Sequence, residues 1–182
     1  MSSLIITAPH SLCFITSPYR NCDTAAFLAS HRLIDQLADF PNIPTIKYFP
    51  SNHHRSEVDL NRAISRQTDY RKNISENLSN AVLLIDVHSF NRKGFGPDVD
   101  VVVLDNVPST WYGKKLYDLM KNHNISVAYI SGSEVNDITE EARHRGIPAI
   151  LIEYGEFIPQ GTIDQINNSV IEWINLMLSS KS

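Results

Sequence analysis

Leu83-Leu84-Ile85-Asp86-Val87-His88-Ser89-Phe90 is an apolar run of strand length that ends in an acid, a histidine and a hydroxyl. Two other segments repeat this plan. Residues 4–10 are an apolar run that leads to His10, and residues 149–153 are an apolar run that ends in Glu153. If these three strands run parallel, His10, His88 and Glu153 meet along one edge of a sheet, where open α/β sheets bind their ligands.

Strand-like and helix-like segments alternate along the 182 residues. Runs of β-branched and other apolar residues predict strands at 3–8, 45–49, 81–87, 99–104, 125–130 and 149–153. Helical spacing, capping residues and prolines predict helices from Asp23 to before Pro41 and at 66–79, 109–122, 136–145 and 162–178. The alternation predicts a three-layer α/β sandwich with a mostly parallel or mixed central sheet, built as a single domain over residues 1–182.

The composition is that of an ordinary globular protein, with 42% hydrophobic and 20% charged residues and a net charge of −4. It provides no basic surface for nucleic acid or for a membrane. The chain has no apolar run near the ~20 residues of a spanning helix and no evident secretory signal. With two cysteines it is not a disulfide scaffold. We therefore expect a cytoplasmic protein that binds neither nucleic acid nor membranes.

The two histidines that follow buried strands, His10 and His88, are candidate zinc ligands. A catalytic zinc commonly has three protein ligands, which leaves one to identify. Asp23, at the predicted start of the first helix, is the first candidate, although it also suits a plain helix cap. Cys13 is the second, although a buried structural cysteine is the more common case. Asp86 shares a strand face with His88, so it either orients that ligand or caps a turn.

Residues 55–62 form a charged run with an arginine at each end, Arg55 and Arg62. Such a run is commonly a solvated loop, but arginine beside a metal suits a carboxylate substrate or a developing oxyanion. Glu153 ends an apolar strand, where burial raises the pKa of a carboxyl and suits it to act as a general base. The alternatives are an ion pair of Glu153 with Arg143 or Arg145, and Glu156 as the base.

These segments together resemble the N-formylglutamate amidohydrolases, which are similar to zinc carboxypeptidases and aspartoacylases. The resemblance spans residues 8–153 and is carried by Pro9-His10-Ser11, the Asp-Leu-Asn-Arg core of residues 55–62, residues 86–89, and Glu153. It departs at Cys13, where a carboxypeptidase-like His-x-x-Glu would have Glu, and at Ser11-Leu12, where the amidohydrolases usually have Ala-Gly.

The resemblance implies a zinc-carboxypeptidase-like (phosphorylase/hydrolase-like) fold and zinc on His10 and His88. It also implies that Glu153 is the general base, that Arg55 polarises the scissile carbonyl, and that Arg62 with Asn61 holds a substrate carboxylate. We therefore expect a zinc-dependent amide hydrolase that cleaves an N-acyl amino acid or a similar small molecule or peptide with a free carboxylate. The alternatives are a metallocarboxypeptidase acting on peptide or peptidoglycan fragments, and a non-catalytic binding module on a degenerate hydrolase fold.

Overall fold

The computed structural model describes residues 2–12, 22–55, 57–91, 98–105, 112–131 and 136–179. Six strands form one sheet in the order β2-β1-β3-β6-β4-β5. Their bounds are β1 Ser3–Ala8, β2 Thr45–Pro50, β3 Ala81–Phe90, β4 Val101–Asp105, β5 Val127–Ser131 and β6 Ala149–Gly155. β2, β1, β3 and β6 are mutually parallel, whereas β4 runs antiparallel to β6 and parallel to β5. The expected mixed α/β sheet is confirmed.

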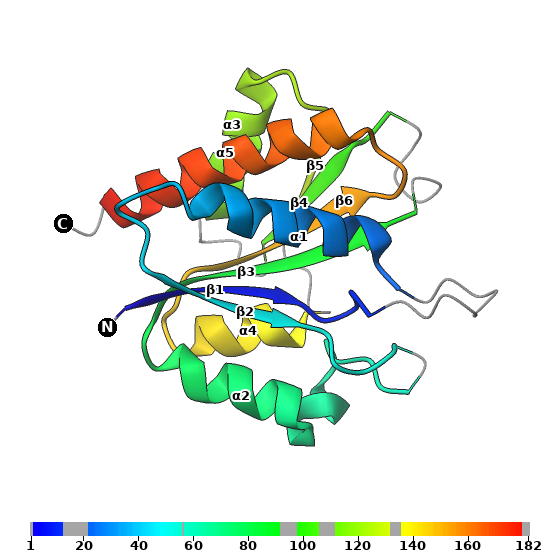
Figure 1. Cartoon of the computed structure of the whole chain (residues 1–182), viewed down its shortest axis with the longest axis vertical. Helices are drawn as coiled ribbons and strands as arrows, with labels where there is room; N and C mark the ends of the chain where they lie inside the picture. Colours follow the sequence, from blue (N-terminus) through cyan, green and yellow to red (C-terminus); the bar gives the residue numbers. More distant parts are fainter. Residues whose placement is uncertain are drawn as a thin grey trace.

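Helices cover both faces of the sheet (Figure 1). α1 (Thr24–Leu37), α3 (Tyr112–Asn122) and α5 (Gln160–Ser179) lie together on one face. α2 (Asp69–Leu78) and α4 (Asp137–His144) lie on the other, preceded by the short 3-10 helix η1 (Ala63–Gln67). The result is the predicted three-layer arrangement, in which each helix buries one apolar stripe against the sheet.

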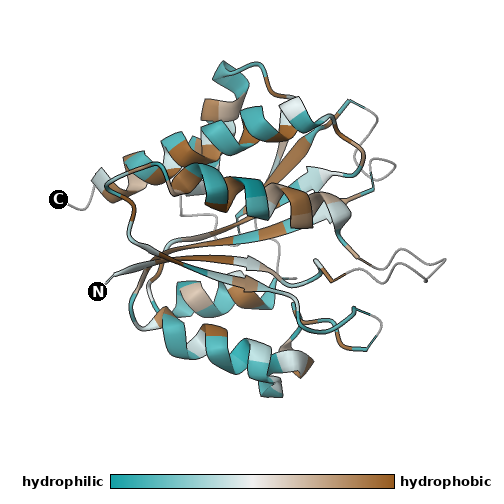
Figure 2. Cartoon of the chain, in the orientation of Figure 1, coloured by the Kyte–Doolittle hydropathy of each residue, from teal (hydrophilic) through white to brown (hydrophobic). Residues whose placement is uncertain are grey.

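The alternation of side chains along β3 explains how one strand serves both the core and a site. Leu83, Ile85 and Val87 belong to the core under α1 and α5. Leu84 points to the opposite face and joins the smaller core under α2 and α4. Since successive side chains alternate across a strand, the next two positions on that second face are Asp86 and His88. Figure 2 shows the apolar strands enclosed by helices whose outer surfaces are hydrophilic.

The structure corrects three of the expected boundaries. The helix expected at 66–79 is divided at Thr68, which has an extended backbone and accepts a hydrogen bond from the Arg71 N–H as the cap of α2. β3 and β6 run on to Phe90 and Gly155, because the two strands stay paired to these residues. Ser109, the expected cap of α3, lies outside the described residues. No helix in the described part of the chain is long and apolar enough to cross a bilayer.

Candidate metal centre

His10, Asp23 and His88 converge at the carboxyl end of the sheet. Each offers one ligand atom, and these atoms lie within 4.8 Å of one another. Asp23 Oδ2 is 3.5 Å from His10 Nδ1 and 3.3 Å from His88 Nδ1, and the imidazole rings meet edge to face with centroids 4.8 Å apart. All three residues are buried. The structure therefore brings together the three residues that the sequence proposes as metal ligands.

The carboxylate of Asp23 is available to this centre because another residue caps α1. Asp23 occupies the N-cap position but makes no side-chain capping hydrogen bond. The Ala25 N–H instead donates to Glu156 Oε1 at 3.2 Å, and the Ser89 hydroxyl donates to the same oxygen at 2.5 Å. Asp23 Oδ2 accepts from the Ser89 N–H at 3.1 Å, which fixes the carboxylate toward the histidines. The alternative of a plain helix cap is therefore wrong for Asp23.

Each histidine presents its second ring nitrogen to another carboxylate. His10 Nε2 lies 2.7 Å from Asp59 Oδ1, and His88 Nε2 lies 2.9 Å from Asp86 Oδ2. A carboxylate behind an imidazole holds the proton on that nitrogen, orients the ring and makes the opposite nitrogen a better ligand. In both rings, this leaves Nδ1 to face Asp23. The predicted role of Asp86 agrees with this geometry.

Asp86 is fully buried and is held by several donors. The Thr7 hydroxyl donates to Oδ1 at 2.5 Å, and the side-chain amides of Asn136 and Asn61 donate to Oδ2 at 3.0 and 3.3 Å. The Asn61 carbonyl accepts from the Ile138 N–H at 3.3 Å. Asn61 therefore lies at the site as predicted, but both ends of its side-chain amide support the protein. Its hydrogen bonds indicate a positioning role, and the predicted contact of Asn61 with substrate stays a prediction, since Asn61 also lines the cavity beside His88.

The charges around the cluster favour a cation at its centre. Burial lowers the pKa of His88, but the charges and hydrogen bonds of Asp86 and Asp23 outweigh burial and raise this pKa well above its ordinary value. Burial raises the pKa of Asp23, but the close approach of the His10 and His88 imidazoles outweighs burial, so the pKa of Asp23 is lowered. Asp23, Asp59 and Asp86 thus keep their negative charges in a largely buried site.

The donor set fits a zinc ion. His10 Nδ1 is buried and has no hydrogen-bond partner among the described residues, although it points at Asp23. An orphaned buried nitrogen is costly unless something binds it. Two imidazole nitrogens and one carboxylate oxygen are a common set of protein ligands for catalytic zinc. His10, His88 and Asp23 would hold the ion and leave a position for a water or a substrate oxygen.

Glu153 lies directly beside this centre. It is the register partner of His88 on β6, so the two side chains occupy adjacent positions on one face of the sheet. Burial raises the pKa of Glu153 above its ordinary value, although the charge of His88 opposes the rise. The alternative of an ion pair at the strand end is wrong, because Arg143 pairs with Glu140 at 3.4 Å and Arg145 with Glu141 at 2.8 Å.

The two predicted arginines lie at the mouth of the site. Arg55 Nη1 is 3.9 Å from Asp23 Oδ1, and its Nη2 is 3.5 Å from Asp59 Oδ2. Arg62 Nε is 3.4 Å from the same Asp59 oxygen. Both guanidinium groups are partly exposed, so they can contact a bound molecule while Asp59 holds them near the histidines.

Sequence reasoning missed Asp59, Thr7 and Asn136. Asp59 stands within the charged run at 55–62, but nothing in its spacing connects it to His10. The other two approach Asp86 from β1 and from the start of α4, contacts that only the folded chain makes. Cys13, the alternative third ligand, lies outside the described residues.

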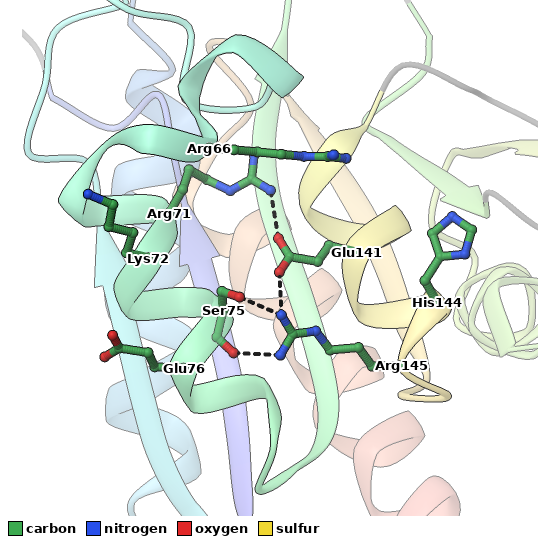
Figure 3. Close-up of a pocket in the computed structure, with 8 residues that line it drawn as sticks. All are labelled: Arg66, Arg71, Lys72, Ser75, Glu76, Glu141, His144 and Arg145. Atoms are coloured by element: carbon green, nitrogen blue, oxygen red, sulfur yellow. Dashed lines mark hydrogen bonds and ion pairs between the residues drawn. The ribbon is translucent and has the colours of Figure 1, made fainter.

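A cavity of about 510 Å³ lies away from the metal centre, between α2 and α4 (Figure 3). Three of its charged side chains, Arg71, Glu141 and Arg145, are tied to one another. Glu141 bridges Arg71 and Arg145, each at 2.9 Å or less, and Arg145 also donates to the Ser75 carbonyl at 2.8 Å. Asp137 adds a second carboxylate 2.7 Å from Arg71. The network clamps the two helices together, and its cations are engaged in that clamp.

The fold is similar to that of solved amidases and metallopeptidases. N-acetylmuramoyl-L-alanine amidase from Clostridium difficile 630 aligns over 100% of this chain and 98% of its own, with a TM-score of 0.65 and 15% identity. The catalytic domain of CwlV, an N-acetylmuramoyl-L-alanine amidase of Bacillus (Paenibacillus) polymyxa, aligns over 98% and 99%, with a TM-score of 0.65 and 12% identity. A protein of Shewanella denitrificans OS217 assigned as a metallopeptidase aligns over 94% and 72%, with a TM-score of 0.63 and 12% identity.

At these identities the likeness establishes the fold, and it confirms the expected hydrolase-like class. No family model matches this sequence, and no curated protein matches it. The resemblance to the N-formylglutamate amidohydrolases is therefore supported at the level of a metal-hydrolase fold, while the solved structures described above are amidases of a different kind and a metallopeptidase.

Proposed function

We propose that the protein is a zinc-dependent amide hydrolase that acts on peptide or peptidoglycan fragments. The observation that carries this proposal is the convergence of His10 Nδ1, His88 Nδ1 and the Asp23 carboxylate beside the partly buried Glu153. The fold shared with N-acetylmuramoyl-L-alanine amidases supports an amide bond of a muramoyl peptide as the bond cleaved. We therefore favour a peptidoglycan fragment as the substrate over an N-acyl amino acid such as N-formylglutamate.

The residues divide the chemistry among them. A zinc ion, when bound, supplies the Lewis acidity that lowers the pKa of a water and polarises a carbonyl. Glu153 takes a proton from the attacking water and delivers it to the leaving amine as the C–N bond breaks. Arg55 stabilises the negative charge that develops on the carbonyl oxygen. Arg62 binds a carboxylate of the peptide part through its planar guanidinium.

A non-catalytic binding module is the alternative class of protein. The sequence feature that favours it is Cys13, which stands where the His-x-x-Glu motif of a carboxypeptidase has its metal-binding Glu. Asp23 takes the place of that Glu, because it brings a carboxylate close to both histidines from the start of α1. The other groups that the structure describes at the centre are in place for catalysis. Both imidazoles have a carboxylate behind them, and Glu153 lies next to His88.

The test combines metal content with turnover, using protein purified without a histidine tag. We expect one zinc per chain, hydrolysis of N-acetylmuramoyl-L-alanyl-D-isoglutamine and weaker activity on N-formylglutamate. Glu153→Gln should retain zinc and lose roughly 10²–10⁴-fold in turnover, because glutamine cannot accept the proton. Glu172→Gln, on the exposed side of α5, is the matched control and should match the wild type.

Three results would contradict the proposal. Zinc-loaded protein that cleaves neither substrate would favour the binding module. Faster turnover of N-formylglutamate would restore the N-acyl amino acid reading. Near-normal turnover by Glu153→Gln would move the general base to another residue.

A further inference from the structure

Asp86, the carboxylate behind His88, is bound by two asparagine side chains that also bind the start of α4. The side-chain nitrogens of Asn136 and Asn61 donate to Asp86 Oδ2 at 3.0 and 3.3 Å. Their side-chain oxygens both accept from the Ile138 N–H, at 3.1 Å for Asn136 and 3.3 Å for Asn61. Two parallel bridges therefore lead from the N-terminus of α4 to the group that supports a proposed metal ligand.

The orientation of the Asn136 side chain is fixed by the helix. Asn136 is the N-cap of α4, and its oxygen also accepts from the Thr139 N–H at 3.1 Å. Because helix donors occupy the oxygen, the NH2 group must turn the other way, toward Asp86. Serine or aspartate would cap a helix about as well. What asparagine adds at this buried position is the second group, which donates to Asp86.

The position of Asp86 decides which ring nitrogen of His88 is free for a metal. An ionised carboxylate only accepts hydrogen bonds, so His88 Nε2, 2.9 Å from Asp86 Oδ2, carries the proton and Nδ1 has none. Asn61 Nδ2 also lies 3.1 Å from His88 Nε2. If Asp86 moved away, this NH2 group would donate to Nε2, and the proton on Nδ1 would block a metal. Donors that hold Asp86 in place therefore keep Nδ1 available.

The start of α4 is suited to this task because it is polarised and firmly held. The peptide dipoles place partial positive charge at a helix N-terminus, and linked hydrogen bonds polarise one another, which makes the two asparagines better donors to a carboxylate. The carboxylate of Asp137 lies 2.5 Å from Arg66 Nη2 and 2.7 Å from Arg71 Nη2. Glu141, one turn later, is also paired with Arg71 (Figure 3). The contacts between α2 and α4 thus fix the helix end to which both asparagines are bonded.

We propose that Asn136 is a positioning residue of the metal centre, through which α4 holds Asp86 behind His88 and so sets the affinity for zinc. This inference rests on the proposed zinc hydrolase and identifies a residue outside the ligand set that controls its metal. The coupling is reciprocal, because a helix cap that strengthens zinc binding is itself strengthened when zinc is bound.

The first experiment separates the helix cap from the contact with Asp86. Competition with a chromophoric chelator measures zinc affinity, and urea denaturation of zinc-free protein measures stability. Asn136→Ser keeps a cap for α4 and Asn136→Ala does not, but neither has the NH2 group that donates to Asp86. We expect both to weaken zinc binding by a similar factor, about 3- to 10-fold. This is less than the roughly 10- to 100-fold for losing the carboxylate itself, because Thr7 and Asn61 still hold Asp86.

The control is a helix cap without this contact. Thr68 caps α2 by accepting from the Arg71 N–H. Thr68→Ala should therefore unfold at a lower urea concentration than the wild type, as Asn136→Ala should, but should bind zinc with wild-type affinity. Cobalt(II), whose visible absorption reports the geometry of its ligands, should give a shifted spectrum in Asn136→Ser and an unchanged one in Thr68→Ala.

The second experiment uses the wild-type chain alone. Hydrogen exchange at the Ile138 and Thr139 N–H groups, which donate to Asn136, is compared in zinc-free and zinc-loaded protein. Reciprocity predicts that exchange there slows about 3- to 10-fold when zinc is bound. The Arg71 N–H, which donates to the cap of α2, should slow less.

The outcomes distinguish this inference from the proposed function. Wild-type zinc affinity in Asn136→Ser, or equal slowing of exchange at Ile138 and Arg71, would overturn the inference while the hydrolase proposal stands. Zinc binding weakened as much in Thr68→Ala as in Asn136→Ser would also overturn it, because Asn136 would then act through stability alone. Zinc-loaded wild-type protein that hydrolyses no muramoyl peptide, with zinc binding still weakened in Asn136→Ser, would overturn the proposed function and leave the positioning role intact.

Discussion

At the scale of single residues, the metal centre depends on which imidazole nitrogen is left to face Asp23. Asp59 and Asp86 approach the Nε2 atoms of His10 and His88, so the Nδ1 atoms point inward. Asp86 is fully buried in a network of fixed donors, whereas Asp59 lies nearer to solvent beside two arginines. Asp59 can therefore be changed with less risk to the fold than Asp86.

We predict that Asp59→Asn weakens zinc binding about 10- to 100-fold, the usual cost of losing a carboxylate behind a ligand histidine. Asparagine can still accept a hydrogen bond from Nε2, but it does not raise the basicity of the ring. Competition with a chromophoric chelator measures the affinity. Asp164→Asn, which breaks an equally short ion pair with Arg32 between α1 and α5, should leave zinc affinity unchanged. Equal affinities for the two variants would show that Asp59 does not tune His10.

The sequence predicted the three proposed ligands because each follows or begins an element with a clear pattern. His10 follows β1, Asp23 precedes α1, and the spacing of two residues between Asp86 and His88 places both on one face of β3. Asp59 and Asn61 belong to a segment without any period, and their contacts with β1 and β3 residues are fixed only by the folded loop. Periodicity identifies elements, but it does not identify partners that loops bring in.

At the scale of elements, α1 is positioned by a carboxylate from another part of the chain. A helix leaves its first backbone N–H groups without partners inside the helix. Glu156, just beyond β6, accepts from one of them at Ala25, and this lets Asp23 turn toward the histidines. The sequence indicated Asp23 as the cap because Asp favours that position, and the contact of Glu156 with α1 spans 131 residues.

We predict that Glu156→Ala lowers the free energy of unfolding by about 1 kcal/mol, the typical cost of losing a helix cap. Glu156→Gln keeps the accepting oxygen and should remain within a few tenths of a kcal/mol of the wild type. The alanine variant should also bind zinc more weakly, because Asp23 is then drawn to the vacant cap. Urea denaturation of the chelator-treated protein and a zinc titration measure the two effects. Equal stability of the two variants would contradict the capping role.

At the scale of the whole molecule, the two faces of the sheet have different tasks. α1, α3 and α5 cover the larger apolar core, while α2 and α4 cover a smaller core that gives way to Asp86 and His88 along β3 (Figure 1). The alternation of strands and helices predicted these layers. It could not predict that the buried Arg71 links α2 to α4. The partner of this arginine on α4, Glu141, lies 70 residues away in the sequence.

Asp137, at the start of α4, pairs with two arginines on this smaller face of the sheet. Its ionisation should make the free energy of unfolding depend on pH. It lies 2.5 Å from Arg66 and 2.7 Å from Arg71. Burial raises its pKa, but the hydrogen bonds and charges of the two arginines outweigh burial, so its pKa is lowered on folding. A carboxyl whose pKa is lowered contributes stability above its unfolded pKa of about 3.9, and loses it as the pH falls through the folded value.

We predict that Asp137→Asn lowers the free energy of unfolding by roughly 1.5–3 kcal/mol at pH 7, because Glu141 is then the one charged partner that Arg71 keeps in the described part of the chain. The gap between wild type and variant should be constant down to about pH 4 and should narrow toward pH 2, because the wild-type carboxyl is then being protonated. Urea denaturation of both proteins across this range measures it. Other acids titrate there too, but their contributions cancel in the difference.

Asp69→Asn, which alters an exposed acid 3.9 Å from Lys72, is the control and should have the same free energy of unfolding as the wild type. A gap that stays constant to pH 2 would mean that Asp137 acts through packing and not through its charge.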